Sequence, residues 1–518
     1  MTLLGSFGAR TARRWGRSAA VGLSAAALAG CAAGPDFAPP DPKLPQTGYT
    51  EAEPWITAPP DPEWWAAFHD PVLTRLERRV ATENLDVVTA TLRIAQSRYQ
   101  RGIAAAALFP TVNGDAQYQR SVDSINGPFL SPNGPFGPLG NALNQLLTSQ
   151  GQPVLPRSPV PYNEFFLGLD ASWELDLWGR VRRMVENADA QADEAGENRR
   201  DVLVSSLAEV ARDYVQLRGF QMALGIENEN LKVAEDILIR AQERAVKGVG
   251  GTIDAENAAA EAENIRAQIP TLEAQQSQSI NALSLLLGQP PGAFAAELSP
   301  PRPVPPAPPR VPVGIASELA RRRPDIRAAE ARLHAATAEI GVAVASFYPT
   351  LQLNGTVGLD SVDVPHLFAP GSLQYMAGPS LKVPLFAGGR LKNMLELTKA
   401  QQQEAAVQYQ QTVLRAWHEV VNALVAYRSE LKRQAALKRE IEHSRGALEL
   451  ARERYSDGVG DFLTVLDTAR TLLQAGQQYA TSTTNVSLDL VQLFKALGGG
   501  WEPVFPSRGA PEKIAVSP

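Results

Sequence analysis

Apolar residues recur every three to four positions through two very long stretches of the chain, residues 180–246 and 391–457, and neither stretch contains a proline. This spacing places the apolar side chains on one face of an α-helix. At 1.5 Å per residue each helix would be roughly 100 Å long, far beyond an ordinary globular helix. We therefore predict coiled-coil rods that pack against one another.

A pair of glycines ends each rod, and a second helical pattern follows it. Glycine adopts the left-handed backbone conformation that commonly ends a helix, so we predict a turn at each pair. The result is two long helical hairpins, over residues 180–288 and 390–498. Pro270 lies inside the first returning helix and is predicted to kink it, because proline removes a backbone hydrogen bond. The turn glycines are Gly248, Gly250, Gly458 and Gly460.

Four shorter segments alternate strictly between apolar and polar residues, which is the period of a β-strand. Segments of about ten residues with one apolar face are typical of the strands of a transmembrane barrel. A soluble sheet with one wet face gives the same alternation. The segments are residues 111–121, 164–176, 350–359 and 374–385.

Four strands are too few to close a barrel, because the smallest bacterial barrels have about eight. An open sheet edge in lipid would leave backbone amides unpaired, each at a cost of several kcal/mol. A membrane sheet of this size must therefore be shared between subunits. This argument allows two, three or four copies.

The chain also repeats itself at an offset of about 210 residues, and no gap is needed over about 109 residues. Glu209 matches Glu419, for example, and Arg244 matches Arg454. This period is far too long for a solenoid and indicates a duplicated half-molecule with internal pseudo-symmetry.

The repeat and the proline-rich stretches predict the domain organisation. Each half holds two strands followed by one helical hairpin. The predicted segments are a signal peptide (1–30), a lipidated extended segment (31–62), the first repeat (63–288), a proline-rich linker (289–312), the second repeat (313–500) and a C-terminal tail (501–518).

The N-terminus has the charged region and the short apolar stretch of a secretory signal. It ends in Leu28-Ala29-Gly30-Cys31, which resembles the lipobox of bacterial lipoproteins, and Cys31 is the only cysteine of the chain. The resemblance implies cleavage before Cys31 and acylation of that residue, with palmitate as one of the chains. Ala32 follows where an Asp would favour the inner membrane, so it implies an outer-membrane anchor. The alternative is an ordinary exported protein with a chance cysteine.

Charge and histidine placement argue against other function classes. The net charge is -6, which provides no basic field for nucleic acid. The five histidines are scattered and show no metal-ligand spacing. We therefore predict that the protein is not an enzyme and has no cofactor apart from the covalent lipid on Cys31.

Five motifs, spread in order along the chain, resemble the NodT/OprM branch of the TolC-like outer-membrane factors. The resemblance covers the chain from Cys31 to Trp501. The motifs are Trp64-Trp65 with Phe68-His69-Asp70-Pro71, the segment from Trp173 to Arg180, the segment from Arg321 to Glu330, Ser346-Phe347-Tyr348-Pro349, and the segment from Lys495 to Trp501.

This resemblance implies an α+β membrane protein that assembles as a homotrimer. Four strands from each subunit would form one 12-stranded β-barrel, continued by a periplasmic tunnel of helices with a small mixed equatorial region. The implied function is the passive exit duct of a tripartite efflux pump in the outer membrane, for drugs or other small molecules. Its implied partners are a periplasmic adaptor and an inner-membrane transporter.

Two alternative functions remain open at this point. The same duct architecture serves protein secretion, but those relatives commonly lack the lipobox and the segment that begins at Arg321. A soluble coiled-coil adaptor would explain the rods but not the alternating strands.

Resemblance to the family also implies a closed aperture at the periplasmic end, lined by Tyr455, Asp461, Leu463 and Asp467. Leu463 and Asp467 are four residues apart and therefore share one helix face. Apolar constrictions gate by dewetting, whereas carboxylate rings favour cations.

The repeat offset maps Leu463 onto Ile253 and Asp467 onto Asn257. The apolar position is thus kept in both halves, and the charge in only one. We expect a ring of three carboxylates and not six. The alternative is that Asp467 is an ordinary solvated residue, or that it pairs with a nearby arginine such as Arg470.

Overall fold

The structure is a computed structural model that describes residues 32–45, 55–56, 58–122, 124, 137–151, 161–248, 251–308 and 310–506. These residues fold into two compact units. The first contains Gln100–Asn187 and Thr337–Lys399 together with the segment up to Asp36. The second contains Phe37–Tyr99, Ala188–Ala336 and the chain from Ala400 onward. Both units draw on both sequence repeats.

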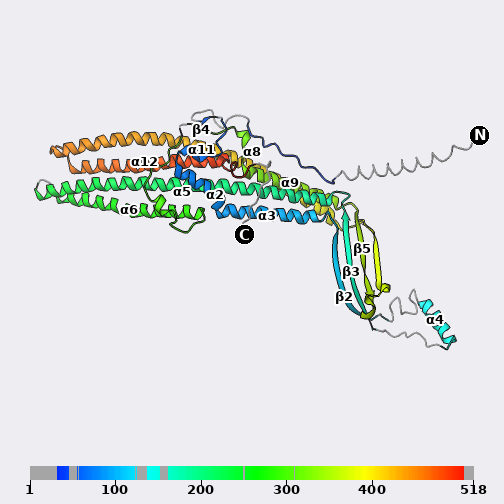
Figure 1. Cartoon of the computed structure of the whole chain (residues 1–518). Coiled ribbons are helices and arrows are strands. Elements are labelled where there is room, and N and C mark those ends of the chain that lie inside the picture. Colours follow the sequence, from blue (N-terminus) through cyan, green and yellow to red (C-terminus); the bar gives the residue numbers. More distant parts are fainter. Residues whose placement is uncertain are drawn as a thin grey trace, which may run out of the picture. The chain divides into compact units, whose positions relative to one another are not determined.

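The first unit is built on one antiparallel sheet of four strands in the order β2-β3-β5-β6 (Figure 1). Each strand covers one of the alternating segments of the sequence. Two short helical segments, α10 (Val364–Leu367) and η3 (Pro370–Ser372), lie between the last two strands, and α4 (Gly137–Ser149) lies between the first two. The strands are β2 (Thr111–Val122), β3 (Pro161–Leu175), β5 (Thr350–Ser361) and β6 (Leu373–Lys382).

The strand register gathers the apolar positions on one face of this sheet. Leu169 pairs with Gly114 on one side and with Val357 on the other, and Val357 pairs with Tyr375. Leu169 is 52% exposed and Tyr375 is 82% exposed, so no other described part of the chain covers this face. A soluble sheet would bury such a face against a second layer.

The fourth strand is shorter than the sequence predicted. It was expected to extend to residue 385, but it ends at Lys382, which pairs with Thr350. Pro349 precedes Thr350 and Pro384 follows shortly after Lys382. The partner strand β5 begins at Thr350, so it offers no further residue to pair beyond Lys382, and the ladder ends there.

Four long helices dominate the chain. Helices α5 (Arg180–Val246) and α11 (Arg390–Ser456) are each 67 residues long. Each is followed by a returning helix, α6 (Thr252–Leu286) or α12 (Phe462–Leu497) (Figure 1). Helix α6 continues through Pro270.

The remaining elements of the described chain are short or of medium length. None of its helices is both long enough and apolar enough to cross a membrane. The elements are β1 (Trp55–Ile56), which pairs in parallel with β4 (Val311–Pro312), η1 (Trp64–Phe68), α2 (Pro71–Glu83), α3 (Leu85–Ala106), α7 (Ala295–Leu298), η2 (Ala316–Glu318), α8 (Leu319–Arg322) and α9 (Pro324–Ala345).

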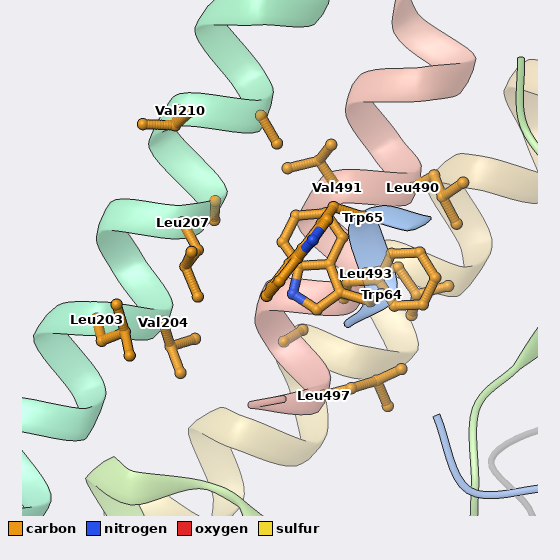
Figure 2. Close-up of a cluster of buried hydrophobic side chains, with 14 of the residues drawn as sticks. Trp64, Trp65, Leu203, Val204, Leu207, Val210, Leu490, Val491, Leu493 and Leu497 are labelled. Atoms are coloured by element: carbon orange, nitrogen blue, oxygen red, sulfur yellow. The ribbon is translucent and has the colours of Figure 1, made fainter. Parts of the chain in front are cut away.

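An aromatic core holds the second unit together. Trp64 is buried and stacks on Phe494, with ring centroids 5.2 Å apart. Figure 2 shows Trp64 and Trp65 between α5, which contributes Leu207, and α12, which contributes Val491. The first motif of the sequence therefore packs where the two hairpins meet.

Arg323 joins the third motif to the fifth. Its guanidinium donates to the carbonyl of Ala496 at 2.8 Å, near the C-terminal end of α12. Gly498 has a φ of 71°, and a Cβ there would lie 2.5 Å from the Arg323 side chain. Trp501 Nε1 donates to the carbonyl of Arg322 at 3.1 Å. Glycine is required at residue 498 both by the backbone and by this close approach.

The second and fourth motifs meet in the first unit. Trp178 stacks on Tyr348 at 4.7 Å and donates from Nε1 to the carbonyl of Pro349 at 2.9 Å. Residues 32–36 lie against the same region, where Ala33 donates its N–H to the Trp178 carbonyl at 2.8 Å. Arg183 forms an ion pair with Asp36 at 2.6 Å.

Glu77 is an unusual carboxyl group in the aromatic core. It is 1% exposed, and neither of its oxygens has a hydrogen-bond partner within the described chain. Burial therefore raises the pKa of Glu77 well above its ordinary value. The pKa of Glu77 in the unfolded chain is about 4.3. The folded protein is therefore most stable below this pH, where the carboxyl group is neutral, and it loses stability as the pH rises through the folded-state pKa and the buried group must ionise.

We predict that Glu77→Gln raises the thermal unfolding temperature at pH 8 but not at pH 4.5. Each unit by which the pKa is raised corresponds to about 1.4 kcal/mol of stability lost at high pH, and the neutral amide avoids this loss. Tryptophan fluorescence of the detergent-solubilised protein, followed during heating, measures the effect.

Glu83→Gln in the same helix is the matched control, and its expected effect on stability at pH 8 is opposite in sign. Arg79 donates two hydrogen bonds to Glu83, at 2.7 and 2.9 Å, and this lowers the pKa of Glu83. Its contribution is present above the unfolded pKa and is lost on acidification. At pH 8 this variant should lose up to about 1 kcal/mol, as expected for a surface pair. If both variants changed the unfolding temperature at pH 8 in the same direction and by the same amount, the raised pKa of Glu77 would be contradicted.

Candidate functional site

The two helical hairpins pack together near their turns. Ile237 of α5, Ala258 of α6, Leu448 of α11 and Leu466 of α12 belong to one buried apolar cluster. Phe462, the first residue of α12, is buried in the same cluster. The ends of all four helices therefore form a single packed body, which positions the predicted aperture residues.

The turns require glycine at two of the predicted positions. Gly248 has a φ of 71° and Gly458 a φ of 75°, in the left-handed region that side chains rarely adopt. Gly460 donates its N–H to the carbonyl of Arg454 at 2.9 Å, which closes the second turn. Gly250 lies outside the described residues.

Tyr455 connects the two hairpins. The Arg244 guanidinium of α5 lies 4.3 Å from the centroid of its ring. The Tyr455 ring also lies 5.8 Å from the Phe462 ring. A cation over an aromatic face is attracted by about 0.5 to 1 kcal/mol at an exposed site, and more when it is buried. Tyr455 therefore holds the end of α11 against α5.

A second contact joins the two returning helices. Arg470 of α12 bonds from Nε to Glu261 of α6 at 2.7 Å. The arginine that the sequence offers as a partner for Asp467 therefore has an ion-pair partner on α6. Gln477 also donates to Gln268, at 3.1 Å. Both bonds join residues 209 positions apart, close to the repeat offset, so equivalent positions of α6 and α12 lie at the same level.

Asp461 is the N-cap of α12. Its Oδ1 accepts the backbone N–H of Thr464 at 2.6 Å. This hydrogen bond lowers the pKa of Asp461. The side chain therefore stabilises the first turn of the helix, a role that the sequence shows only as an Asp before an apolar run.

Leu463 and Asp467 point away from the packed body. Leu463 is 60% exposed, and its repeat equivalent Ile253 is 68% exposed. Asp467 is also exposed, on the same face of α12 as Leu463. The four predicted residues thus divide into two that hold the hairpins, Tyr455 and Asp461, and two that face outward. The lipidation residue Cys31 lies outside the described residues.

The family profile described as "Outer membrane efflux protein" matches residues 77–289 and 315–499, which together make up most of the chain. The chain belongs to the outer membrane efflux protein family. The resemblance inferred from the five motifs is therefore confirmed. The protein functions in efflux at the outer membrane, which is transport and not a chemical conversion.

Two curated relatives and one solved structure illustrate the similarity. The toluene efflux pump outer membrane protein TtgC of Pseudomonas putida is 30% identical over 485 residues, 92% of this chain and 94% of TtgC. The pyoverdine export outer membrane protein OpmQ, also of Pseudomonas putida, is 32% identical over 458 residues, 87% of this chain and 90% of OpmQ. The outer-membrane channel OprN matches with a TM-score of 0.82 and 32% identity, over 91% of this efflux protein and all of OprN.

Sequence reasoning missed two of the contacts that join the hairpins of this efflux protein, the Arg470–Glu261 bond and the stacking of Arg244 on Tyr455. The Arg470–Glu261 bond could have been found from the repeat, because its partners are almost one repeat apart. The stacking of Arg244 on Tyr455 could not, because the equivalent of Tyr455 in the first repeat is Ala245.

We predict that Asp461→Ala destabilises the first turn of α12, because the N-cap hydrogen bond is lost. Hydrogen exchange of the amides of residues 462–466 should become faster, and Asp461→Ser should restore the wild-type rate. Asp467→Ala is the matched control, because its side chain caps nothing. Unchanged exchange in Asp461→Ala would show that the cap does not stabilise the turn.

Proposed function

We propose that three copies of this chain close one 12-stranded β-barrel and continue as a helical tunnel, forming the passive exit duct of a tripartite efflux pump. One observation carries the proposal: the four-stranded sheet has an uncovered apolar face and two edge strands, β2 and β6, that pair with no further strand of the described chain. In lipid, pairing β6 of one copy with β2 of the next would give the edge amides hydrogen-bond partners.

Small molecules are the proposed cargo. TtgC is named for toluene efflux and OpmQ for pyoverdine export, and both relatives cover nearly the whole of this chain. We propose that an inner-membrane transporter supplies the energy and selects the cargo, and that a periplasmic adaptor joins it to the duct. A duct for protein secretion is the alternative.

Acylation of Cys31 is proposed to anchor each subunit in the outer membrane. The segment that follows Cys31 is held against the first unit by the Ala33–Trp178 hydrogen bond and the Arg183–Asp36 ion pair. Trp178 lies three residues beyond the end of β3. These two contacts support a lipid anchor that lies close to the end of β3.

The outward face of α12 is proposed to line the closed aperture. Leu463 and Asp467 are both exposed on this face of the single subunit. Residues that contact their own copies in a trimer must be exposed when the subunit is viewed alone. Three copies would form an apolar ring beside a ring of three carboxylates. The first ring excludes water and the second attracts cations.

We predict that Leu463→Ala and Asp467→Ala each increase the single-channel conductance of the purified protein in planar lipid bilayers. The first change widens an apolar constriction, and the second removes carboxylates that hold cations at the narrowest point. Asn257→Ala, at the repeat equivalent of Asp467, is the control and should change the conductance little. Unchanged conductance in both test variants would exclude this face as the aperture.

Deletion of the gene should increase susceptibility to drugs or solvents and leave the set of secreted proteins unchanged. Growth inhibition and the composition of the culture supernatant measure the two outcomes. The secretion alternative predicts the reverse result, with lost secreted proteins and unaltered susceptibility.

A further inference from the structure

We propose that Phe166 and Met376 form an apolar contact patch on the polar face of the sheet, and that this patch gives neutral aromatic cargo a transient binding place inside the duct. The inference rests on the proposed function, in which the polar face lines the lumen of the barrel. It adds to that function a class of cargo and the side chains that such cargo would touch.

These two side chains differ from all their neighbours on that face. The register places Phe166 opposite Asp360 of β5, and Met376 opposite Thr356 of the same strand. Every other strand residue that the structure describes on this face is a glycine or carries a polar group in its side chain. In the proposed barrel, Phe166 and Met376 would therefore be the apolar surface that passing cargo meets on the strands.

The Phe166 ring lies over two glycines that pair directly with each other, Gly168 of β3 and Gly358 of β5. A Cβ at Gly168 would lie 2.5 Å from the ring Cζ, and a Cβ at Gly358 would lie 2.8 Å from the ring Cε2. Glycine inside a strand weakens it and often marks a place where another group approaches the backbone closely. Here the two glycines leave room for the ring against the strand backbone.

Met376 lies within reach of this ring. Its direct partner Thr356 is two residues from Gly358 along β5, so Met376 is a diagonal neighbour of a glycine that the ring covers. Diagonal neighbours on one face are about 7–8 Å apart, a distance that aromatic and long side chains can span. Met376 is 73% exposed, and Gly378, two residues further along β6, adds no side chain that could cover it. The patch is therefore accessible from the polar side of the sheet.

The chemistry of a phenyl ring and a thioether favours an aromatic guest. The glycine backbone covers one side of the Phe166 ring, and the ring remains partly exposed, so a guest can approach it from the other side. Aromatic rings stack in offset or edge-to-face arrangements and gain free energy beyond the area that they bury. Methionine sulfur also contacts aromatic rings favourably, and its flexible side chain adapts to guests of different shape. A saturated ring of similar size would bury a similar area without either gain.

Two neutral alcohols of similar size, benzyl alcohol and cyclohexylmethanol, test the preference for an aromatic ring. Each is added at the same concentration to single wild-type channels in planar bilayers bathed in KCl, and the fraction of the current that it blocks is measured. Benzyl alcohol should block several-fold more current than cyclohexylmethanol. Phe166→Leu and Met376→Ala should each reduce this difference, and Phe166→Tyr should retain it.

The matched controls are the sequence neighbours on the opposite face of the sheet. Phe165→Leu and Tyr375→Leu change aromatic residues of the apolar face, so both variants should keep the wild-type difference between the two alcohols. Both alcohols also enter the bilayer, and the control variants share that background with the test variants.

The possible failures are distinguishable. If the wild-type protein forms no channel, the proposed function fails and this inference falls with it. If the channel conducts but both alcohols block it equally, the duct stands and this inference is overturned. The same holds if Phe166→Leu lowers the thermal unfolding temperature and leaves the difference between the alcohols unchanged, because the ring would then only cover the glycines.

A second measurement needs no bilayer, so it also serves for a variant that does not insert. Saturation-transfer NMR on the detergent-solubilised protein should show magnetisation passing from the protein to benzyl alcohol. The transfer should be weaker in Phe166→Leu than in Phe165→Leu, and equal transfer in these two variants would contradict a binding place at Phe166.

Discussion

Backbone hydrogen bonding at the two edges of the sheet is the constraint on which the rest of the arrangement depends. In hydrocarbon an unpaired amide costs several kcal/mol, and β2 and β6 each leave the backbone groups of their outer edge unpaired in the described chain. In the proposed barrel, lipid would contact the face that holds Leu169 and Tyr375, and a single sheet could not remain there with open edges. The proposed trimer answers this constraint, because copies of one chain supply both missing neighbours.

The motifs that are recognisable in the sequence are points where distant segments meet. Trp64 stacks on Phe494, and Arg323 reaches from the start of α9 to the carbonyl of Ala496. A smaller side chain at either position would leave a cavity or an unpaired carbonyl at the same junction. The buried Glu77 shows that this core also tolerates a carboxyl group, at a cost that depends on pH.

The ends of the hairpins separate two tasks among neighbouring residues. Tyr455 and Asp461 make contacts within the subunit and hold the turn, whereas Leu463 and Asp467 face outward. A change at the first pair alters the stability of the tip. In the proposed trimer, a change at the second pair alters the residues that the three copies bring together. Both kinds of change would affect conductance, and only the first would affect local hydrogen exchange.

Periodicity alone determined the elements of this protein, because a helix or a strand depends on residues close together in the chain. It located both rods, both glycine turns and all four strands, with an error at β6, which ends at Lys382 opposite the first residue of β5. Only the tertiary structure decided which residues meet. The stacking of Arg244 on Tyr455 and the hydrogen bond from Arg323 to the Ala496 carbonyl each join residues from distant parts of the chain. Register and helix packing bring such partners together, and neither follows from local spacing.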